Sequence, residues 1–262
     1  MSIDPGPRIR ELLETFKLPT TAEELVPRLS AAGREDALPT VLEVFELEAE
    51  DRKQRRTTRL RRASRLPPGK TLDTLETKRL PRRLSQQLQR LAQGEFLDRA
   101  VNLLAFGLPG TGKTHSMCAM GHALIEAGHS VLFTPAYKLV QTLLAAKRDL
   151  DLPRALRKLD NFELLILDDI GYVQQSGIET EVLFTLLAER YERRSVAITS
   201  NLVFSEWDQI FKNPLTTAAA IDRLVHHSEI LEFDVTSYRT EAAKAHQPSS
   251  KEATQTARRE PR

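Results

Sequence analysis

A three-layer α/β domain with a parallel sheet is the fold class that the sequence predicts for residues 66–240. Short, continuously apolar segments alternate there with longer amphipathic segments, as in 164–167 and 179–191. Strands of this kind are buried on both faces, because helices cover both sides of a parallel sheet. A glycine-rich loop between the apolar segment 101–106 and a helical segment is a second observation that favours this class.

Each expected element of this domain has its own pattern of apolar residues. Leucines at helical spacing mark the first helix, and Gly128 is a suitable C-terminal cap for the helix after the glycine-rich loop. Continuous apolar residues mark the strands. In chain order we expect a helix through Leu84, Leu88 and Leu91, strand 101–106, a helix ending at Gly128, strand 130–134, helix 137–147, strand 164–167, helix 179–191, strand 196–199 and strand 230–233.

Residues 1–65 are expected to form a small all-helical domain. Apolar residues recur there at helical spacing, at Ile9, Leu12, Leu13 and Phe16. Thr21 and Glu24 have the spacing of a capping box in front of a second helix, and a third helix is broken by Pro-Pro-Gly at 67–69. The domain has too little apolar surface for an enzyme core, so we expect it to bind DNA or a partner protein.

A strongly basic stretch begins at the end of this domain. Residues 51–83 contain thirteen Lys and Arg against three Asp and Glu, although the whole chain of 262 residues has a net charge of only +2. This density predicts a polyanionic partner, most simply nucleic acid, with a solvated basic helix as the alternative. The candidate DNA contacts in the stretch are Arg55, Arg56, Arg59, Arg61 and Arg62.

The remaining composition predicts a cytoplasmic protein. The single cysteine, Cys118, excludes an internal disulfide, and it lies on an apolar helix face where a small buried residue is expected. Residues 1–10 contain no apolar signal region, and no segment is long and apolar enough to span a membrane. Residues 241–262 contain no Val, Ile, Leu, Met or aromatic residue and are expected to be disordered.

The glycine-rich loop reads Gly-Leu-Pro-Gly-Thr-Gly-Lys-Thr over 107–114 and matches the phosphate-binding pattern GxxxxGKT. Its glycines allow backbone N–H groups to turn toward a phosphate, while Lys113 reaches the β and γ oxygens and Thr114 holds Mg²⁺. The pattern therefore predicts binding of ATP or GTP. The candidate nucleotide-binding residues are Gly107, Pro109, Gly110, Thr111, Gly112, Lys113, Thr114 and His115.

Polar residues that end two later strands supply the candidate catalytic groups. Asp168 and Asp169 follow four apolar residues, as in a Walker B strand; Asp168 would complete the Mg²⁺ site and Asp169 would orient the attacking water. Asn201 ends the next strand and fits a sensor of bound phosphate. A buried strand entering a loop is the alternative for the acid pair, and an ordinary turn residue is the alternative for Asn201.

The order of these motifs resembles that of one family. From 80 to 240 the chain is similar to the IstB-type transposition helper ATPases, which are related to the DnaC-type helicase loaders within the AAA+ superfamily. The segments that carry the likeness are 107–115, 167–172, 187–193, 199–202, 204–207 and 220–224. The resemblance implies a P-loop NTPase of AAA+ type with an ASCE-type parallel sheet, and ATP with Mg²⁺ as cofactors. The chain departs from most AAA+ modules after the last strand, where only a polar tail follows, so we expect the helical lid to be reduced or absent.

The resemblance also implies roles for residues that no pattern singles out. Arg223 would be an arginine finger that reaches the nucleotide of a neighbouring subunit, and Arg239 would be a second sensor in cis, with surface ion pairs as the alternative for both. ATP hydrolysis would then depend on assembly. Asp169 stands where most AAA+ proteins have Glu, so its carboxylate is one methylene shorter, and we expect activity to survive at a lower rate.

A basic helical segment at 147–158 is the second candidate for DNA contact. In the initiators and loaders that the chain resembles, such an insert lines a channel for DNA, and a solvated helix face is the alternative. Its candidate phosphate contacts are Lys147, Arg148, Arg154, Arg157 and Lys158.

His226 and His227 have no Cys or carboxylate at ligand spacing in the sequence, so we expect them to be structural.

Together these observations predict an ATP-dependent helper of transposition. Its AAA+ domains would oligomerise on duplex target DNA, with ATP at the subunit interfaces, and would deliver that DNA to a transposase. A replicative helicase loader acting on single-stranded DNA is the first alternative, and a nucleotide-regulated adaptor that binds only protein is the second. Asn201 and the two late arginines argue against a third, a small-molecule kinase.

Overall fold

The computed structural model describes residues 4–172, 177–207 and 214–238. The chain divides into two compact units, residues 1–62 and 63–262. The boundary between these units follows residue 62, whereas the sequence predicts it after residue 65. The expected disordered tail, 241–262, and the expected reduction of the lid fall outside the described residues.

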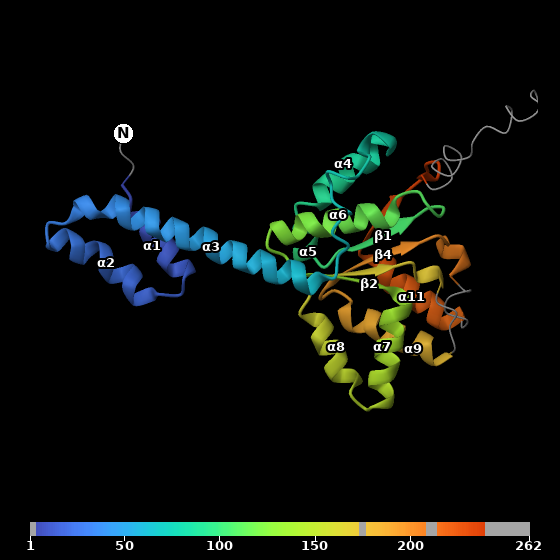
Figure 1. Cartoon of the computed structure of the whole chain (residues 1–262). Coiled ribbons are helices and arrows are strands. Elements are labelled where there is room, and N and C mark those ends of the chain that lie inside the picture. The colour runs from blue at the N-terminus through green and yellow to red at the C-terminus, as the bar shows by residue number, and fades with distance from the viewer. Residues whose placement is uncertain (1–3, 173–176, 208–213, 239–262) are drawn as a thin grey trace, which may run out of the picture. The chain divides into compact units, whose positions relative to one another are not determined.

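The N-terminal unit is built from helices, as the sequence predicts (Figure 1). The buried apolar residues of the first helix, among them Ile9 and Leu13, pack with Leu38 of the third. An edge-to-face contact between Phe16 and Phe45, with ring centroids 6.2 Å apart, joins the same two parts of the chain. The elements of this unit are α1 (Gly6–Thr15), α2 (Pro19–Ala31), η1 (Glu35–Ala37) and α3 (Leu38–Ser64).

The capping box predicted at Thr21 and Glu24 is wrong. α2 begins at Pro19, and Leu18 precedes it without a side-chain cap hydrogen bond, so Thr21 lies inside the first turn. Proline suits the first position of a helix, because its φ is already helical and it has no N–H group to satisfy. The helix therefore begins two residues before the polar residue that resembles a cap.

Five parallel strands form the sheet of the larger unit, in the order β2-β3-β4-β1-β5. β4 lies between β1 and β3, although it follows both in sequence. Because all strands run the same way, the segments that follow β1, β3 and β4 meet at one edge of the sheet, which we call the carboxyl edge; the opposite edge is the amino edge. The strands are β1 (Asn102–Phe106), β2 (Val131–Pro135), β3 (Leu164–Asp168), β4 (Ser195–Ser200) and β5 (Ser228–Glu232).

Helices cover both faces of this sheet, which confirms the three-layer prediction (Figure 1). α4 and α6 lie on one face, and α7, α9 and α11 lie on the other. On the second face Leu139, Leu183 and Trp207 share one apolar core with β1, β3 and β4, and Trp207 is fully buried. The bounds are η2 (Thr77–Arg79), α4 (Arg82–Leu91), α5 (Glu95–Asp98), α6 (Lys113–Glu126), α7 (Ala136–Arg148), α8 (Leu152–Asp160), η3 (Ile170–Tyr172), α9 (Gly177–Arg190), η4 (Phe204–Glu206) and α11 (Pro214–His226).

The basic helical segment predicted at 147–158 is two helices in the structure. α7 ends at Arg148 and α8 begins at Leu152. Leu150, between them, has a φ of 56°, a left-handed conformation that ends a helix. The candidate basic residues of this segment are therefore divided between two helices.

Within the described residues, no helix has the length and apolar character that a membrane span requires.

Arg190 joins the end of α9 to the amino edge of the sheet. Its residue surface is 1% exposed, and its guanidinium donates to the backbone oxygens of Leu159, Phe162 and Ser195 at 2.9–3.0 Å. Desolvation by burial lowers the pKa of Arg190 to about 10. An arginine held in this way connects α8, α9 and β4, so we assign it a structural role.

Replacement of Arg190 by methionine is expected to lower the free energy of unfolding by roughly 3–5 kcal/mol, because several buried carbonyl oxygens lose their donor. Urea denaturation followed by circular dichroism measures the change. Arg193→Met is the control, since the side chain of Arg193 is 59% exposed and its ion pair with Asp160 lies at the surface. Equal stability of the two variants would contradict the structural role.

Candidate functional site

The phosphate loop connects the carboxyl end of β1 to the start of α6. Gly107, Gly110 and Gly112 have φ values of 153°, 84° and 94°, which residues other than glycine rarely adopt. A Cβ atom at Gly107 would lie 2.6 Å from the backbone oxygen of Phe233, closer than non-bonded atoms approach. The glycines therefore permit a turn that ends at the N-terminus of α6, where free N–H groups and the helix dipole favour an anion.

Lys113 brings a positive charge into the curve of this loop. Its residue surface is 8% exposed, and Nζ donates to the backbone oxygens of Gly107 at 2.6 Å and Leu108 at 2.9 Å. Thr111 Oγ1 donates to the same oxygen of Leu108 at 2.8 Å and braces the turn. The ammonium group is therefore held at the loop, where phosphate oxygens can accept its hydrogen bonds.

A chain of hydrogen bonds connects the phosphate loop to β3 and β4. Thr114 Oγ1 donates to Asp168 Oδ1 at 2.7 Å, and Thr199 Oγ1 donates to the same oxygen at 2.8 Å. The backbone N–H of Asp169 donates to Thr199 Oγ1 at 2.8 Å. One hydroxyl of β4 thus fixes both the side chain of Asp168 and the backbone of Asp169.

The hydroxyl of Thr114 and the carboxylate of Asp168 form a donor set that fits Mg²⁺. Both groups offer oxygen, which this ion prefers, and they already lie in contact, so one ion can reach both. Mg²⁺ typically keeps several waters and is completed by phosphate oxygens, which the neighbouring loop would place. The residues present are therefore compatible with the expected Mg²⁺ site.

Asp169 and Asn201 lie beside this network. Asp169 has a φ of 63°, a left-handed conformation that Asp tolerates better than most residues because its short side chain bonds locally. A Cβ atom at Gly171 would lie 2.4 Å from Asn201 Oδ1, so the amide of Asn201 packs directly against the turn that follows Asp169. Asn201 Oδ1 is buried, and no described atom bonds it. A buried polar atom without a partner is costly to keep, which favours a role with a ligand.

A cavity of about 380 Å³ opens next to the phosphate loop. This volume suits a small-molecule ligand. Of the eight predicted nucleotide-binding residues, Gly110, Gly112, Lys113, Thr114 and His115 line it, whereas Gly107, Pro109 and Thr111 do not. The other lining residues are Lys70, Thr74, Leu75, Glu76 and Tyr238.

The sequence did not predict that the segment 70–76 takes part in the site. Contacts with other segments explain how it forms a wall of this cavity. His115 Nε2 lies 3.0 Å from Thr74 Oγ1 and 3.3 Å from the backbone oxygen of Thr71. The backbone N–H of Tyr238 donates to Gly110 O at 3.0 Å, and the guanidinium of Arg79 lies 3.9 Å from the centre of the Tyr238 ring. These contacts join segments distant in sequence, so no local pattern could reveal them.

Arg223 is not near the phosphate loop of its own chain. The backbone oxygen of Leu224 accepts a hydrogen bond from Asn102 Nδ2 at 3.4 Å, which places this part of α11 at the start of β1. Gly107 follows the other end of β1, about 17 Å away at roughly 3.3 Å per residue. The guanidinium of Arg223 lies 4.7 Å from the centre of the Phe184 ring, and its Nη1 is buried with no bond to any described atom. Arg239 lies outside the described residues.

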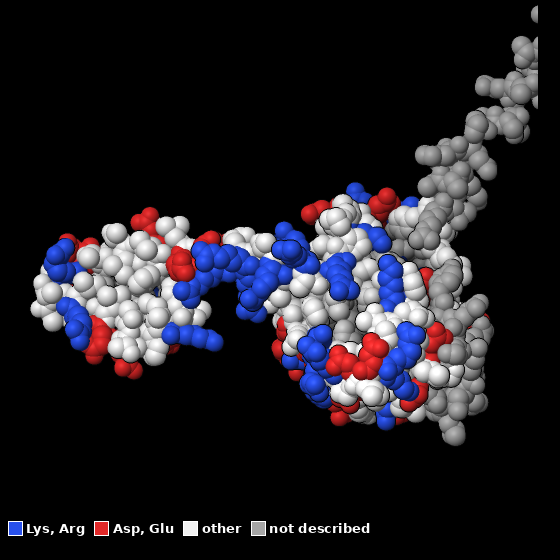
Figure 2. Space-filling model, turned by 60° about the horizontal axis from the view of Figure 1, so that its bottom comes forward, with Lys and Arg blue, Asp and Glu red and all other residues white. Residues whose placement is uncertain are grey.

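The candidate DNA contacts lie on the surface. On α3 the basic side chains gather along one stretch of the helix (Figure 2), and Arg55 forms an ion pair with Asp51. In the second basic segment Lys147 forms an ion pair with Glu181. The exposed candidates are Arg55, Arg56, Arg59, Arg61, Arg62, Arg148, Arg154, Arg157 and Lys158, whereas Lys147 is half-buried.

Cys118 is fully buried on α6, and burial raises the pKa of its thiol to about 12. A thiol with so high a pKa is not a nucleophile at neutral pH. The structure therefore agrees with the expectation that Cys118 is a small core residue.

The fold and the site together define a P-loop nucleotide-binding protein with an AAA+-type fold. The structure of DnaA from Aquifex aeolicus bound to AMPPCP matches with a TM-score of 0.56 and 17% identity, over 70% of this chain and 56% of that one. The structure of DnaI matches with a TM-score of 0.54 and 19% identity, over 66% of this chain and 96% of that one. At these identities the likeness shows the fold, and it confirms the predicted class.

The chain belongs to the family of IstB-like ATP binding proteins, whose model matches residues 13–246. An insertion sequence ATP-binding protein of Sinorhizobium fredii is 43% identical over 240 residues, covering 90% of this chain and 80% of that protein. An insertion sequence ATP-binding protein of Geobacillus stearothermophilus is 32% identical over 234 residues, covering 88% and 93%. These findings confirm the family that the motifs predict.

Proposed function

We propose that this chain hydrolyses ATP, assembles on duplex target DNA and delivers that DNA to the transposase of an insertion sequence. The observation that carries the ATPase part is the hydrogen-bonded network of Thr114, Asp168, Thr199 and Asp169. It connects a hydroxyl and a carboxylate that would hold Mg²⁺, beside a phosphate loop, to the backbone of Asp169, the residue proposed to orient water. Relatives that are named as insertion sequence ATP-binding proteins support the link to transposition.

Each residue of the site has a distinct part in the proposed hydrolysis. The loop N–H groups and Lys113 bind the β and γ phosphates, and Thr114 with Asp168 would hold Mg²⁺, which supplies positive charge to the phosphate oxygens. Asp169 orients the attacking water by accepting its hydrogen bond. Asn201 Oδ1, which no described atom bonds, provides a second acceptor close to that water.

The finger role of Arg223 requires a second subunit. Within one chain Arg223 lies toward the amino edge of the sheet, whereas the phosphate loop lies at the carboxyl edge. An arginine side chain does not span the length of a strand, so Arg223 can act only on the nucleotide of a neighbour. The second sensor, Arg239, is proposed from the family resemblance alone.

Exposed arginines on α3 provide the proposed electrostatic contact with duplex DNA (Figure 2). Each phosphate that such a side chain neutralises contributes to binding that weakens with salt, with a log–log slope of about 0.9 per contact. Contacts of this kind position the DNA and do not read its sequence. Ion pairs compete with DNA at two of the proposed contacts, because Lys147 is paired with Glu181 and Arg55 with Asp51.

A replicative helicase loader is the second candidate function, because structures of DnaC and DnaI share the fold. Their identity to this chain is 19%, so the likeness extends to the fold and no further. A protein-only adaptor is the third candidate, and it would leave the exposed arginines of α3 without a polyanionic partner. Membership of the IstB-like family favours the transposition helper over both.

Electron microscopy and size-exclusion chromatography with ATP test the proposal, using a duplex of about 50 base pairs and a single strand of equal length. We expect oligomers that need both ATP and the duplex. The matched variant replaces Arg55, Arg59 and Arg62 by glutamine, and it should assemble less and show a smaller salt slope. Preference for the single strand would favour the helicase loader, and indifference to both DNAs would favour the protein-only adaptor.

Thr199 is a positioning residue for the proposed hydrolysis. Thr199→Val keeps the shape of the side chain but removes both hydrogen bonds, so we expect ATP turnover to fall about 100-fold through misplacement of the two acids. The KM for ATP should change little, because the phosphate loop is intact. Thr199→Ser keeps the hydroxyl and should restore most of the turnover. If valine and serine gave the same rate, the hydroxyl would not position the acids.

A further inference from the structure

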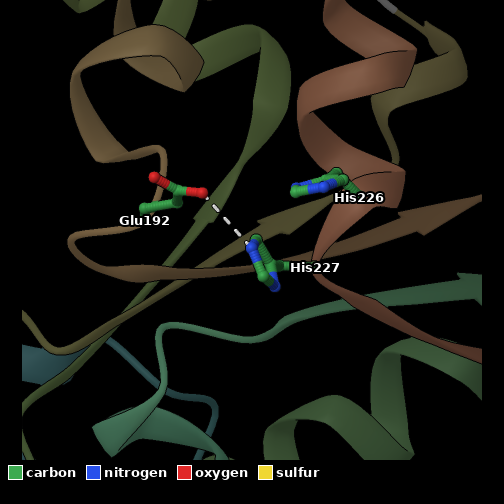
Figure 3. Close-up of side chains that lie close together, drawn as sticks. All are labelled: Glu192, His226 and His227. Atoms are coloured by element: carbon green, nitrogen blue, oxygen red, sulfur yellow. Dashed lines mark ion pairs between the residues drawn. The ribbon is translucent and has the colours of Figure 1, made fainter.

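Glu192, His226 and His227 form a cluster that the proposed hydrolysis does not use. One ligand atom from each residue lies within 4.8 Å of the others, and His227 Nε2 is 3.3 Å from Glu192 Oε1. Figure 3 shows the three side chains around a common space, with Glu192 coming from the turn after α9 and the histidines from the end of α11. Glu192 is not at ligand spacing from the histidines in the sequence, but folding brings it to them.

Tyr191 holds one histidine of this cluster in an orientation suited to metal binding. The Tyr191 hydroxyl lies 3.0 Å from His226 Nδ1. With a proton on Nδ1, the ring donates to the Tyr191 oxygen, and the lone pair of Nε2 is free for a metal ion. Metal-binding histidines commonly use their second ring nitrogen in this way, because the bond fixes both tautomer and ring orientation.

Asn102 joins the two segments that carry the cluster. Its Oδ1 accepts a hydrogen bond from the N–H of Val196, close to the turn that contains Glu192, at 2.9 Å. Its backbone N–H donates to the backbone oxygen of His227 at 2.6 Å. Asn102 is buried at the start of β1, so the donor atoms are mounted on a connected framework and not on independent loops.

The donor set selects the class of ion. Two imidazole nitrogens and one carboxylate oxygen suit Zn²⁺ and its transition-metal neighbours, whereas Mg²⁺ and Ca²⁺ prefer oxygen alone. Three protein ligands leave one position of a tetrahedral site for water or for another ligand. All three side chains are exposed, so an ion can reach them from solvent. The rest of the described chain contains no other group of three such residues within this distance.

We propose that Glu192, His226 and His227 bind one Zn²⁺ ion at the amino edge of the sheet. The ion would tie the turn after α9 to the end of α11. Arg223 lies on the same helix, three residues before His226, so the bound ion also fixes the end of the helix that carries the proposed finger. The site does not depend on the proposed ATPase activity, since none of its ligands belongs to the phosphate loop or to the acid pair.

Zn²⁺ binding to the tag-free, metal-stripped full chain tests this proposal, without nucleotide and in competition with a chromophoric chelator. We expect one equivalent to bind, and Co²⁺ in its place to give the visible absorption of a tetrahedral centre. His226→Gln, His227→Gln and Glu192→Gln should each weaken Zn²⁺ binding at least 10-fold. Tyr191→Phe should weaken it by about 10-fold, through loss of ligand orientation.

His129→Gln is the matched control, because His129 lies 3.0 Å from Glu163 in a pair that lacks a second histidine. This variant should bind Zn²⁺ as the parent chain does. Circular dichroism of each metal-free variant confirms that loss of binding is not loss of folding. Equal Zn²⁺ affinity of the parent chain and of the His226→Gln/His227→Gln double variant would overturn the proposal, as would binding weakened equally by His129→Gln.

Discussion

Replacement of Arg223 by alanine is expected to lower the ATP turnover of the assembled protein by roughly 10³–10⁵-fold, the range typical of an arginine finger supplied by a neighbouring subunit. ATP affinity of the isolated subunit should change little, because the phosphate loop lies at the opposite edge of the sheet. Phosphate release measured at saturating ATP and DNA gives the first quantity. Titration with a fluorescent ATP analogue gives the second.

Mixing two inactive variants tests whether the finger acts between subunits. The Arg223→Ala subunit has an intact phosphate loop, and the Lys113→Ala subunit has an intact arginine finger. Some interfaces of a mixed assembly therefore combine an intact loop with an intact finger, and ATP turnover should partly return. Arg193→Ala is the control for positive charge near the end of α9; its exposed guanidinium bonds Asp160 at 3.0 Å, and turnover should be unchanged. If mixing restored no activity while mixed oligomers formed, a finger acting in trans would be excluded.

Replacement of Lys113 by alanine is the second change with a large expected effect. Lys113 Nζ is held at two carbonyl oxygens of the loop, and loss of charge-assisted bonds to phosphate should weaken ATP binding by about 10- to 100-fold. Hydrolysis should fall further, because the same charge stabilises the transferring phosphoryl group. Calorimetric titration with ATP and Mg²⁺, followed by phosphate release, measures both effects.

Lys138→Ala provides the comparison for this lysine. Lys138 is exposed on α7, 6.0 Å from the centre of the Tyr137 ring, and does not line the cavity beside the loop. Its replacement should leave ATP binding and turnover unchanged. Unaltered ATP affinity in Lys113→Ala would mean that the phosphate binds elsewhere, and the assignment of the loop would fail.

The sequence predicted those features of the site that follow from local spacing. The glycines of the loop, Lys113 and Thr114 are fixed by a short pattern, and the structure brings Thr114 into contact with Asp168 as the order of strands requires. Asn201 was predicted from its place at the end of a strand, and it lies against Gly171 beside the acid pair. The catalytic roles of these residues remain predictions that the experiments above address.

Other features depend on contacts between segments that are distant in the chain. Thr199 is one of many threonines in the sequence, and only the position of β4 between β1 and β3 places its hydroxyl on Asp168. Glu192 is separated from His226 by 34 residues, so ligand spacing along the chain could not reveal the cluster. The capping pattern at Thr21 failed for a local reason, since Pro19 begins the helix earlier.

The sequence by itself determined the class of fold, the position of the glycine-rich loop and the family, because each of these depends on periodicity or on a short motif of fixed spacing. Tertiary structure alone decided which side chains share a hydrogen-bond network, which segments wall the cavity and which edge of the sheet carries Arg223. The physical reason is that hydrogen bonds and metal ligation act over a few ångströms in space. The pairing of five parallel strands brings residues from distant parts of the domain to within a few ångströms of one another, whatever their separation along the chain.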